Sequence, residues 1–91
     1  MRQIDMISNE SDNGAIEAIF YALRKAETKF PGWPDDVVHG AAIMAEEAGE
    51  SVKAALDLYY GRGDIANLKK EVAQTGAMAI RFLIYLHREG L

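Results

Sequence analysis

A short acidic stretch, Glu46-Glu47-Ala48-Gly49-Glu50, holds the side chains in this sequence that are best suited to chemistry. Its three carboxylates fall at helical spacings of three and four, which place neighbours on one face of a helix. Like charges at that distance repel each other, so the stretch costs stability unless solvent or a cation relieves it. A second motif, Glu71-Val72-Ala73-Gln74, follows after twenty residues. We expect the two motifs to meet and hold a divalent metal.

Oxygen ligands alone suit a hard cation, so the motifs favour Mg²⁺, with Mn²⁺ as the alternative. Glu50 lies ten residues before Tyr60, and Gln74 lies ten residues after Asp64. In an antiparallel helical hairpin, a rise of about 1.5 Å per residue puts both roughly 15 Å from the connection. Glu50 and Gln74 should therefore be level. Periodicity leaves open whether the two faces turn toward each other, and the other interpretation is a solvated acidic surface without metal.

Capping and turn residues predict the first helix and the bend after it. Residues 1–8 are compatible with either a short helical turn or a docked extended arm. A helix should begin with Ser11 or Asn13 as its cap and end near Lys29. The stretch 30–36 contains two prolines and a glycine, which break a regular helix.

Two longer helices should follow this bend and carry the acidic motifs. The second is predicted from about Val37 to Tyr60, with Asp35 as its N-cap. The third should be capped by Asp64 and run to about Glu89, where a glycine follows. The sequence thus predicts an all-α fold with three main helices.

Each predicted helix has an apolar stripe that we expect to be buried. The apolar surface of the third helix extends well beyond one face, which favours burial on two sides. We therefore expect a homodimer or homotetramer, in which oligomerisation completes the helical hairpin into a core of the four-helix-bundle type. The stripes are Ile16, Phe20, Leu23 and Phe30 in the first helix, Val38, Ala41, Ala45, Ala48, Val52, Ala55 and Tyr59 in the second, and Ile65, Leu68, Val72, Ala79, Leu83 and Leu86 in the third.

Length and composition limit the possible functions. With 91 residues the chain is expected to form one domain, spanning residues 1–91. A net charge of -4 and the lack of a basic run argue against nucleic-acid binding. No apolar run reaches membrane-spanning length, and the sequence contains no cysteine, which fits a cytoplasmic protein.

Several side chains outside the acidic motifs are candidates for contact with a ligand. Trp33, the single tryptophan, is either a lid over the helix ends or a platform for a flat ligand such as a base. The polar stripe of the first helix is either a solvated face or one from which Glu17, Arg24 or Lys25 points toward a ligand. Arg81 suits an ion pair with a carboxylate better than contact with a phosphate.

The two motifs and their surroundings resemble the MazG-like all-α nucleoside triphosphate pyrophosphohydrolases. The signature of that family is Glu-Glu-x-x-Glu, a spacer and then Glu-x-x-Asp, and this chain has Glu46-Glu47-Ala48-Gly49-Glu50, twenty residues, and Glu71-Val72-Ala73-Gln74. The approach Phe30-Pro31-Gly32-Trp33-Pro34 and the run 46–56 are also similar to small members. The resemblance covers about residues 30–83.

The resemblance implies a role for each matching residue. Glu47, Glu50 and Glu71 would be Mg²⁺ ligands, and Glu46 would be a further ligand or the base that orients water. Lys53, one turn beyond Glu50, would contact a phosphate. The implied reaction cleaves a nucleoside triphosphate between its α- and β-phosphates, giving a nucleoside monophosphate and pyrophosphate. Family members assemble as dimers or tetramers whose paired helices form four-helix bundles.

The chain departs from the family signature at Gln74, where the family has an aspartate. An amide oxygen can still coordinate a metal, but it carries no charge, so the attraction for Mg²⁺ is weaker. Two functions therefore remain open. One is the Mg²⁺-dependent pyrophosphohydrolase, and the other is a non-catalytic helical oligomer that binds a nucleotide or a protein partner.

Overall fold

Three helices make up the part of the chain that the computed structural model describes, residues 10–91. They are α1 (Glu10–Lys29), α2 (Val37–Tyr59) and α3 (Ile65–Arg88). The expected all-α class with three main helices is confirmed, and the ends of α2 and α3 fall within one residue of their predicted positions. Residues 1–8, for which a helical turn or an extended arm was open, lie outside the described residues.

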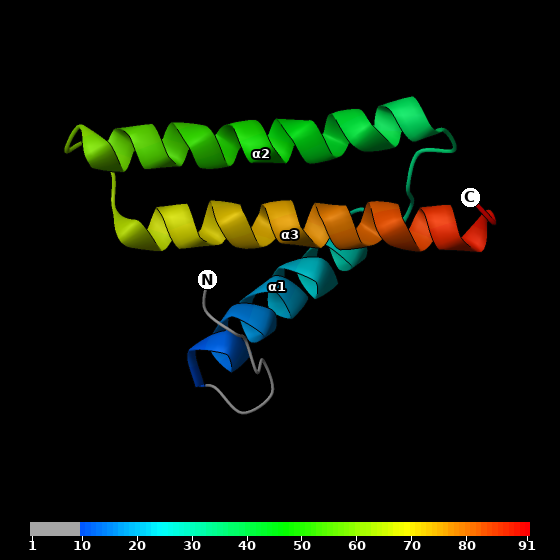
Figure 1. Cartoon of the computed structure of the whole chain (residues 1–91), viewed down its shortest axis with the longest axis horizontal. Helices are drawn as coiled ribbons and strands as arrows, with labels where there is room; N and C mark the ends of the chain where they lie inside the picture. The colour runs from blue at the N-terminus through cyan, green and yellow to red at the C-terminus, as the bar shows by residue number, and fades with distance from the viewer. Residues whose placement is uncertain (1–9) are drawn as a thin grey trace, which may run out of the picture.

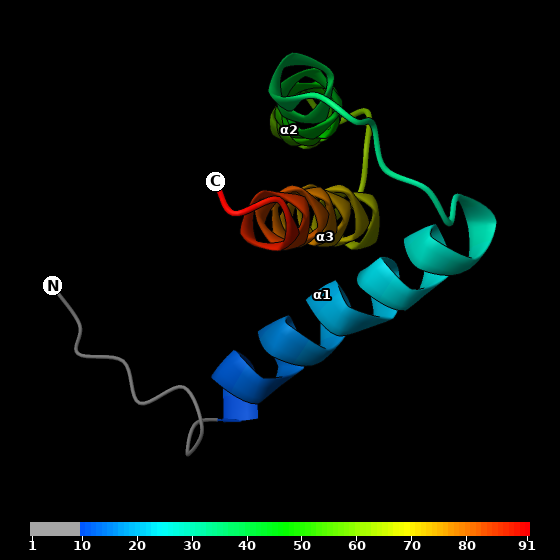
Figure 2. The same cartoon turned by 90° about the vertical axis from the view of Figure 1, so that its right-hand side faces the viewer.

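Helix α3 is the central element of the fold. It packs against α2 on one side and α1 on the other, while α1 and α2 do not pack on each other within the described residues. Figure 1 shows α2 running antiparallel beside α3, and Figure 2 shows α1 crossing the opposite side of α3 at an oblique angle. No helix in the described residues is long and apolar enough to span a membrane.

Aspartates cap the two helices of the hairpin. At α2 the cap is Asp36 rather than Asp35, and its carboxylate accepts a hydrogen bond of 2.8 Å from the backbone N–H of His39. An N-cap side chain reaches the amides two or three residues on, so the residue directly before the first helical one serves best. The predicted cap Asp64 is confirmed at α3, where it accepts from the N–H of Asn67 at 2.7 Å.

The start of α1 differs from the sequence prediction. The helix begins at Glu10, so Ser11 and Asn13 lie inside its first turn instead of capping it. Acidic side chains in a first turn interact favourably with the positive end of the helix dipole, which allows an earlier start. At the other end of the chain, Gly90 has a φ of 72°, which confirms it as the residue that ends α3.

The packing around α3 depends on small residues. A methyl group at Gly40 of α2 would lie 2.8 Å from the Phe82 ring, and one at Gly76 of α3 would lie 3.1 Å from Ile19 of α1. These glycines let each neighbouring helix approach α3 closely. The buried residues are correspondingly few and mostly small: Gly40, Ala54, Ala73, Ala77, Met78 and Arg81.

The apolar stripe predicted for α2 does not face α3. Val38, Val52 and Tyr59 are 73%, 59% and 81% exposed. Instead α2 packs through a face that contains Gly40 and Ala54, because small residues allow a closer approach than the valines of the stripe. The predicted stripes of α1 and α3 are likewise only partly covered, and the large apolar side chains they leave exposed are Phe20, Phe30, Ile65, Val72 and Leu83.

We predict that Gly40→Ala destabilises the protein. The added methyl group would overlap the Phe82 ring, and overpacking costs about 1–3 kcal/mol, which exceeds the gain of about 1 kcal/mol from replacing a helical glycine. Thermal unfolding should show a Tm lowered by several degrees. Gly49→Ala is the matched control, since nothing lies within 4 Å of its added methyl group, and it should raise the Tm. A Tm lowered by Gly49→Ala would contradict this and reveal a partner packed there.

Candidate functional site

Hydrogen bonds between α2 and α3 bring the two acidic motifs together. The Thr75 hydroxyl lies 2.8 Å from the Ser51 hydroxyl and 3.0 Å from the backbone carbonyl of Glu47, and it shares its proton between this carbonyl and that of Glu71 at 2.9 Å. Thr75 adjoins Gln74, while Glu47 and Ser51 flank Glu50, so the motifs are level as the sequence predicted. The question that periodicity left open is answered here, because the Glu47 face of α2 is turned toward α3.

The electrostatics of Glu47 reflect this arrangement. Burial raises the pKa of Glu47 above its usual value of 4.5, and the nearby carboxylates of Glu71, Glu46 and Glu50 raise it further, in that order. Glu47 and Glu71 are half-buried, whereas Glu46 and Glu50 are exposed. A negative field from both helices therefore converges on Glu47. A cation bound at this point would relieve both the repulsion and the loss of hydration.

The donor set fits a cation that shares its ligands with a substrate. Among residues 10–91, no three His, Asp or Glu side chains are grouped closely enough to hold a metal ion by themselves. Glu47 and Glu71 interact across the hairpin, and the Gln74 side chain lines the space beside them. Mg²⁺ is usually held by one or two carboxylates, with waters and phosphate oxygens completing its shell, which these residues match.

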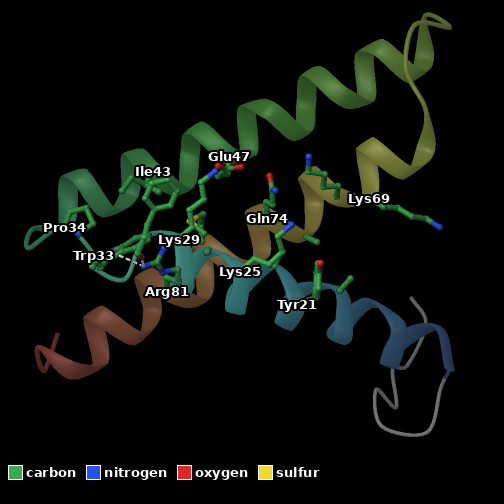
Figure 3. Close-up of a pocket in the computed structure, with 18 of the residues that line it drawn as sticks. Tyr21, Lys25, Lys29, Trp33, Pro34, Ile43, Glu47, Lys69, Gln74 and Arg81 are labelled. Atoms are coloured by element: carbon green, nitrogen blue, oxygen red, sulfur yellow. Dashed lines mark hydrogen bonds between the residues drawn. The ribbon is translucent and has the colours of Figure 1, made fainter.

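A cleft of about 900 Å³ is lined by residues of α1, α2 and α3, with α3, its floor, between the other two helices. One end is aromatic and apolar, formed by Trp33, Pro34 and Ile43, and Glu47 lies at its middle (Figure 3). Four lysines and one arginine line it, against a single carboxylate, that of Glu47. The cleft is thus basic in a protein of net charge -4. Its cationic residues are Lys25, Lys29, Lys69, Lys70 and Arg81.

Arg81 fixes the bend that forms the aromatic end. Its guanidinium is buried and donates to the backbone carbonyls of Phe30 and Gly32, the latter at 2.8 Å. The carboxylate partner expected for Arg81 is therefore wrong, because backbone carbonyls of the bend after α1 take its place. The guanidinium also lies 5.1 Å from the centroid of Trp33, a cation–π distance.

Of the two roles that the sequence left open for Trp33, the structure shows that of a lid, and the role of a platform for a ligand stays a prediction. Its ring stacks on Phe82 with centroids 6.2 Å apart, so it covers the helix ends as a lid. It also lines the cleft, where a flat ligand can reach it. The indole N–H is buried without a hydrogen-bond partner in the described residues, which is a cost that this packing carries.

Two substrate-binding candidates lie elsewhere. Arg24 and Lys53 are exposed and do not line the cleft, whereas Lys25, next to Arg24, does. Consecutive helical residues point about 100° apart, so a shift of one position changes the face. Sequence analysis missed Lys29 and the two lysines of α3. A signal for the α1 face was present in Ala18, Ala22 and Ala26, which recur every fourth residue and line the cleft.

We predict that Glu47→Gln stabilises the metal-free protein at neutral pH. A carboxyl with a raised pKa contributes its full stability below about pH 4.5, where it is protonated, and loses it as the pH rises through its folded pKa. In EDTA, the Tm advantage of the variant should be near zero at pH 4 and grow toward pH 7.

Millimolar Mg²⁺ should raise the Tm of the unmodified protein and leave the variant nearly unchanged, because a bound ligand stabilises the native state. Glu89→Gln, at the far end of α3, serves as the control for loss of one charge. Equal Tm values for the unmodified protein and Glu47→Gln at pH 7 would contradict the conclusion that burial and the neighbouring carboxylates destabilise the charged form of Glu47.

Comparison with protein-family models, with curated proteins and with solved structures finds no match to this chain. The resemblance to the MazG-like family therefore rests on residues within the chain, namely the two acidic motifs, their spacing and the Phe30–Pro34 approach. What the site can do follows from its own chemistry, which is a meeting of carboxylates beside a basic and aromatic cleft.

Proposed function

We propose that the protein is a Mg²⁺-dependent nucleotide pyrophosphohydrolase, which cleaves nucleoside triphosphates between the α- and β-phosphates. The observation that carries this proposal is that Glu47, under the field of Glu71, lies at the middle of a cleft that is otherwise basic and aromatic. A nucleoside triphosphate needs an aromatic surface for its flat base, basic side chains for its phosphate chain and a carboxylate for its bound cation. The lack of cysteine fits the cytoplasm as the compartment.

Each acidic residue has a part in the proposed reaction. Glu47 and Glu71 would hold Mg²⁺, and Gln74 offers a neutral amide oxygen beside them. Glu50 is exposed and is not grouped with them as a third ligand in the described residues, so it would join the ligands only once metal and phosphate are bound. When bound, Mg²⁺ supplies neutralisation of phosphate charge and acidification of water. The oxygen of a water molecule adds to phosphorus, the bridging P–O bond breaks, and Glu46 accepts the proton of the water. The products are a nucleoside monophosphate and pyrophosphate.

We further infer a homodimer or homotetramer in which the α2–α3 hairpin becomes part of a four-helix-bundle core. Large apolar side chains on both helices support this, since Val52 and Tyr59 of α2 and Ile65, Val72 and Leu83 of α3 are all more than half exposed. A single chain leaves this surface in water, whereas a second copy would bury it.

A nucleotide-binding protein without catalysis is the second candidate. Gln74 favours it, because the neutral amide removes one carboxylate from the motif and the described residues hold no group of three acidic ligands. The basic cleft and Trp33 would still bind a nucleotide in that case. Turnover separates the two candidates.

We predict metal-dependent release of pyrophosphate from at least one nucleoside triphosphate. The assay takes a panel of nucleoside triphosphates with Mg²⁺, with Mn²⁺ or with EDTA. Glu50→Gln should reduce release to background while circular dichroism stays unchanged, because the change removes a ligand and some repulsion together. Glu89→Gln should retain full activity. A folded protein that releases no pyrophosphate from any nucleotide would establish the binding protein instead.

We predict that Val52→Glu shifts the assembly toward the monomer. A charge placed in an apolar interface must be desolvated on association, which opposes burial of that surface. Analytical ultracentrifugation should show a smaller species than for the unmodified protein, while Lys53→Glu, one residue along α2, leaves the assembly unchanged. An unmodified protein that sediments as a 10.0 kDa monomer would contradict the proposed oligomer.

A further inference from the structure

We propose that Lys25 of α1 and Lys70 of α3 form a polyphosphate subsite, which holds the β- and γ-phosphates of a nucleotide at the end of the cleft opposite Trp33. No feature of the acidic motifs assigns these lysines. The direction of the nucleotide rests on the proposed function, whereas the binding of a polyphosphate chain does not. The subsite thus gives the cleft a preference for triphosphates over monophosphates.

The order of residues along the cleft sets this direction. On the floor, Lys70 is followed one turn later by Gln74, then by Met78, and finally by Arg81 at the aromatic end. At about 1.5 Å per residue, the distance along α3 from Lys70 to Arg81 is roughly 16 Å. The opposite wall follows the same order, since Lys29 lies nearer Trp33 and Lys25 lies one turn farther away (Figure 3). An extended ligand can therefore contact the aromatic end, Glu47 and the lysines at once.

No ion pair among residues 10–91 neutralises these lysines. Among residues 10–91, the ion pairs to carboxylates are those of Asp36 with His39 and of Asp57 with Arg62, and neither pair is in the cleft. The cleft lysines are left to bind an external anion.

Aromatic rings position the ammonium groups on the α1 wall. The Lys25 ammonium lies 5.4 Å from the centroid of Tyr21, and the Lys29 ammonium lies 5.4 Å from that of Phe30. A cation held over a ring keeps its N–H groups available on the side away from the ring. On the floor, Ala66, Lys69 and Lys70 belong to the first two turns of α3, whose dipole adds positive potential.

The chemistry of the two ends differs, and a nucleotide matches both. Trp33, Pro34, Ile43 and Met78 offer a flat and apolar surface to a base at one end. The lysine end offers cationic side chains, small side chains and the Tyr21 ring that lies beside Lys25. A monophosphate that places its base on Trp33 would reach the middle of the cleft but not Lys70, and therefore would lose the contacts that a triphosphate makes.

The test compares Lys25→Gln/Lys70→Gln with Arg62→Gln/Arg88→Gln, which removes the same two charges outside the cleft. Calorimetry in EDTA measures the binding of inorganic tripolyphosphate, so that neither metal nor turnover is involved. The unmodified protein should bind it, and the lysine variant should bind at least about tenfold more weakly, since each lost charge-assisted contact is worth about that factor. Added salt should weaken binding. The arginine variant should match the unmodified protein.

No binding of tripolyphosphate, or an equal loss in the arginine variant, would overturn the subsite. Lysine-dependent binding in a protein that hydrolyses no nucleotide would support the subsite and refute the proposed function. A lysine variant that hydrolyses nucleoside triphosphates with the KM of the unmodified protein would refute the subsite and support the proposed function.

A second set of binding measurements distinguishes a nucleotide from free polyphosphate as the ligand. A nucleoside triphosphate should bind more tightly than tripolyphosphate, because Trp33 adds contact with its base, and a nucleoside monophosphate should bind more weakly than the triphosphate. Equal affinity for the nucleoside triphosphate and tripolyphosphate would overturn the direction of the nucleotide and identify a site for free polyphosphate.

Discussion

The close contact between α2 and α3 is the constraint on which the rest of the structure depends. The Thr75 hydroxyl joins the two helices through Ser51 and the Glu47 carbonyl, at a level where only small groups separate them. Gly40 extends the same contact toward Phe82. Because these contacts fix the rotation of α2 about its own axis, they also fix the direction of the Glu47 side chain. If α2 were turned by half a turn, Glu47 would point away from the cleft.

The contact between α1 and α3 determines the other half of the site. Gly76 admits Ile19 closely, and Arg81 anchors the bend after α1 by holding two of its carbonyls. Together they place the lysines of α1 on the wall of the cleft that faces Glu47 of α2. Opposite charges are thus presented on facing walls without neutralising each other directly, which leaves both available to a bound cation and its anionic ligand.

Features that depend on neighbouring residues were predictable from the sequence, whereas features that depend on how the helices pack on one another were not. The cap at Asp64, the stop at Gly90 and the level of Glu50 with Gln74 follow from neighbouring residues and from helical rise. The face that α2 turns to α3 does not, because its apolar stripe from Val38 to Tyr59 predicted a different rotation. The prediction of a carboxylate partner for Arg81 was wrong for a similar reason, since its partners are carbonyls some fifty residues away, at Phe30 and Gly32.

Gln74 acquires a specific meaning from its position. It lies on the floor of the cleft, one turn from Lys70 and beside the field that raises the pKa of Glu47. A carboxylate there would strengthen the hold on a metal, but it would also repel the phosphate chain next to it. The neutral amide gives up part of the metal affinity and removes that repulsion. Under the proposed function, metal and polyphosphate then bind together, because the phosphate oxygens supply the ligands that the protein lacks.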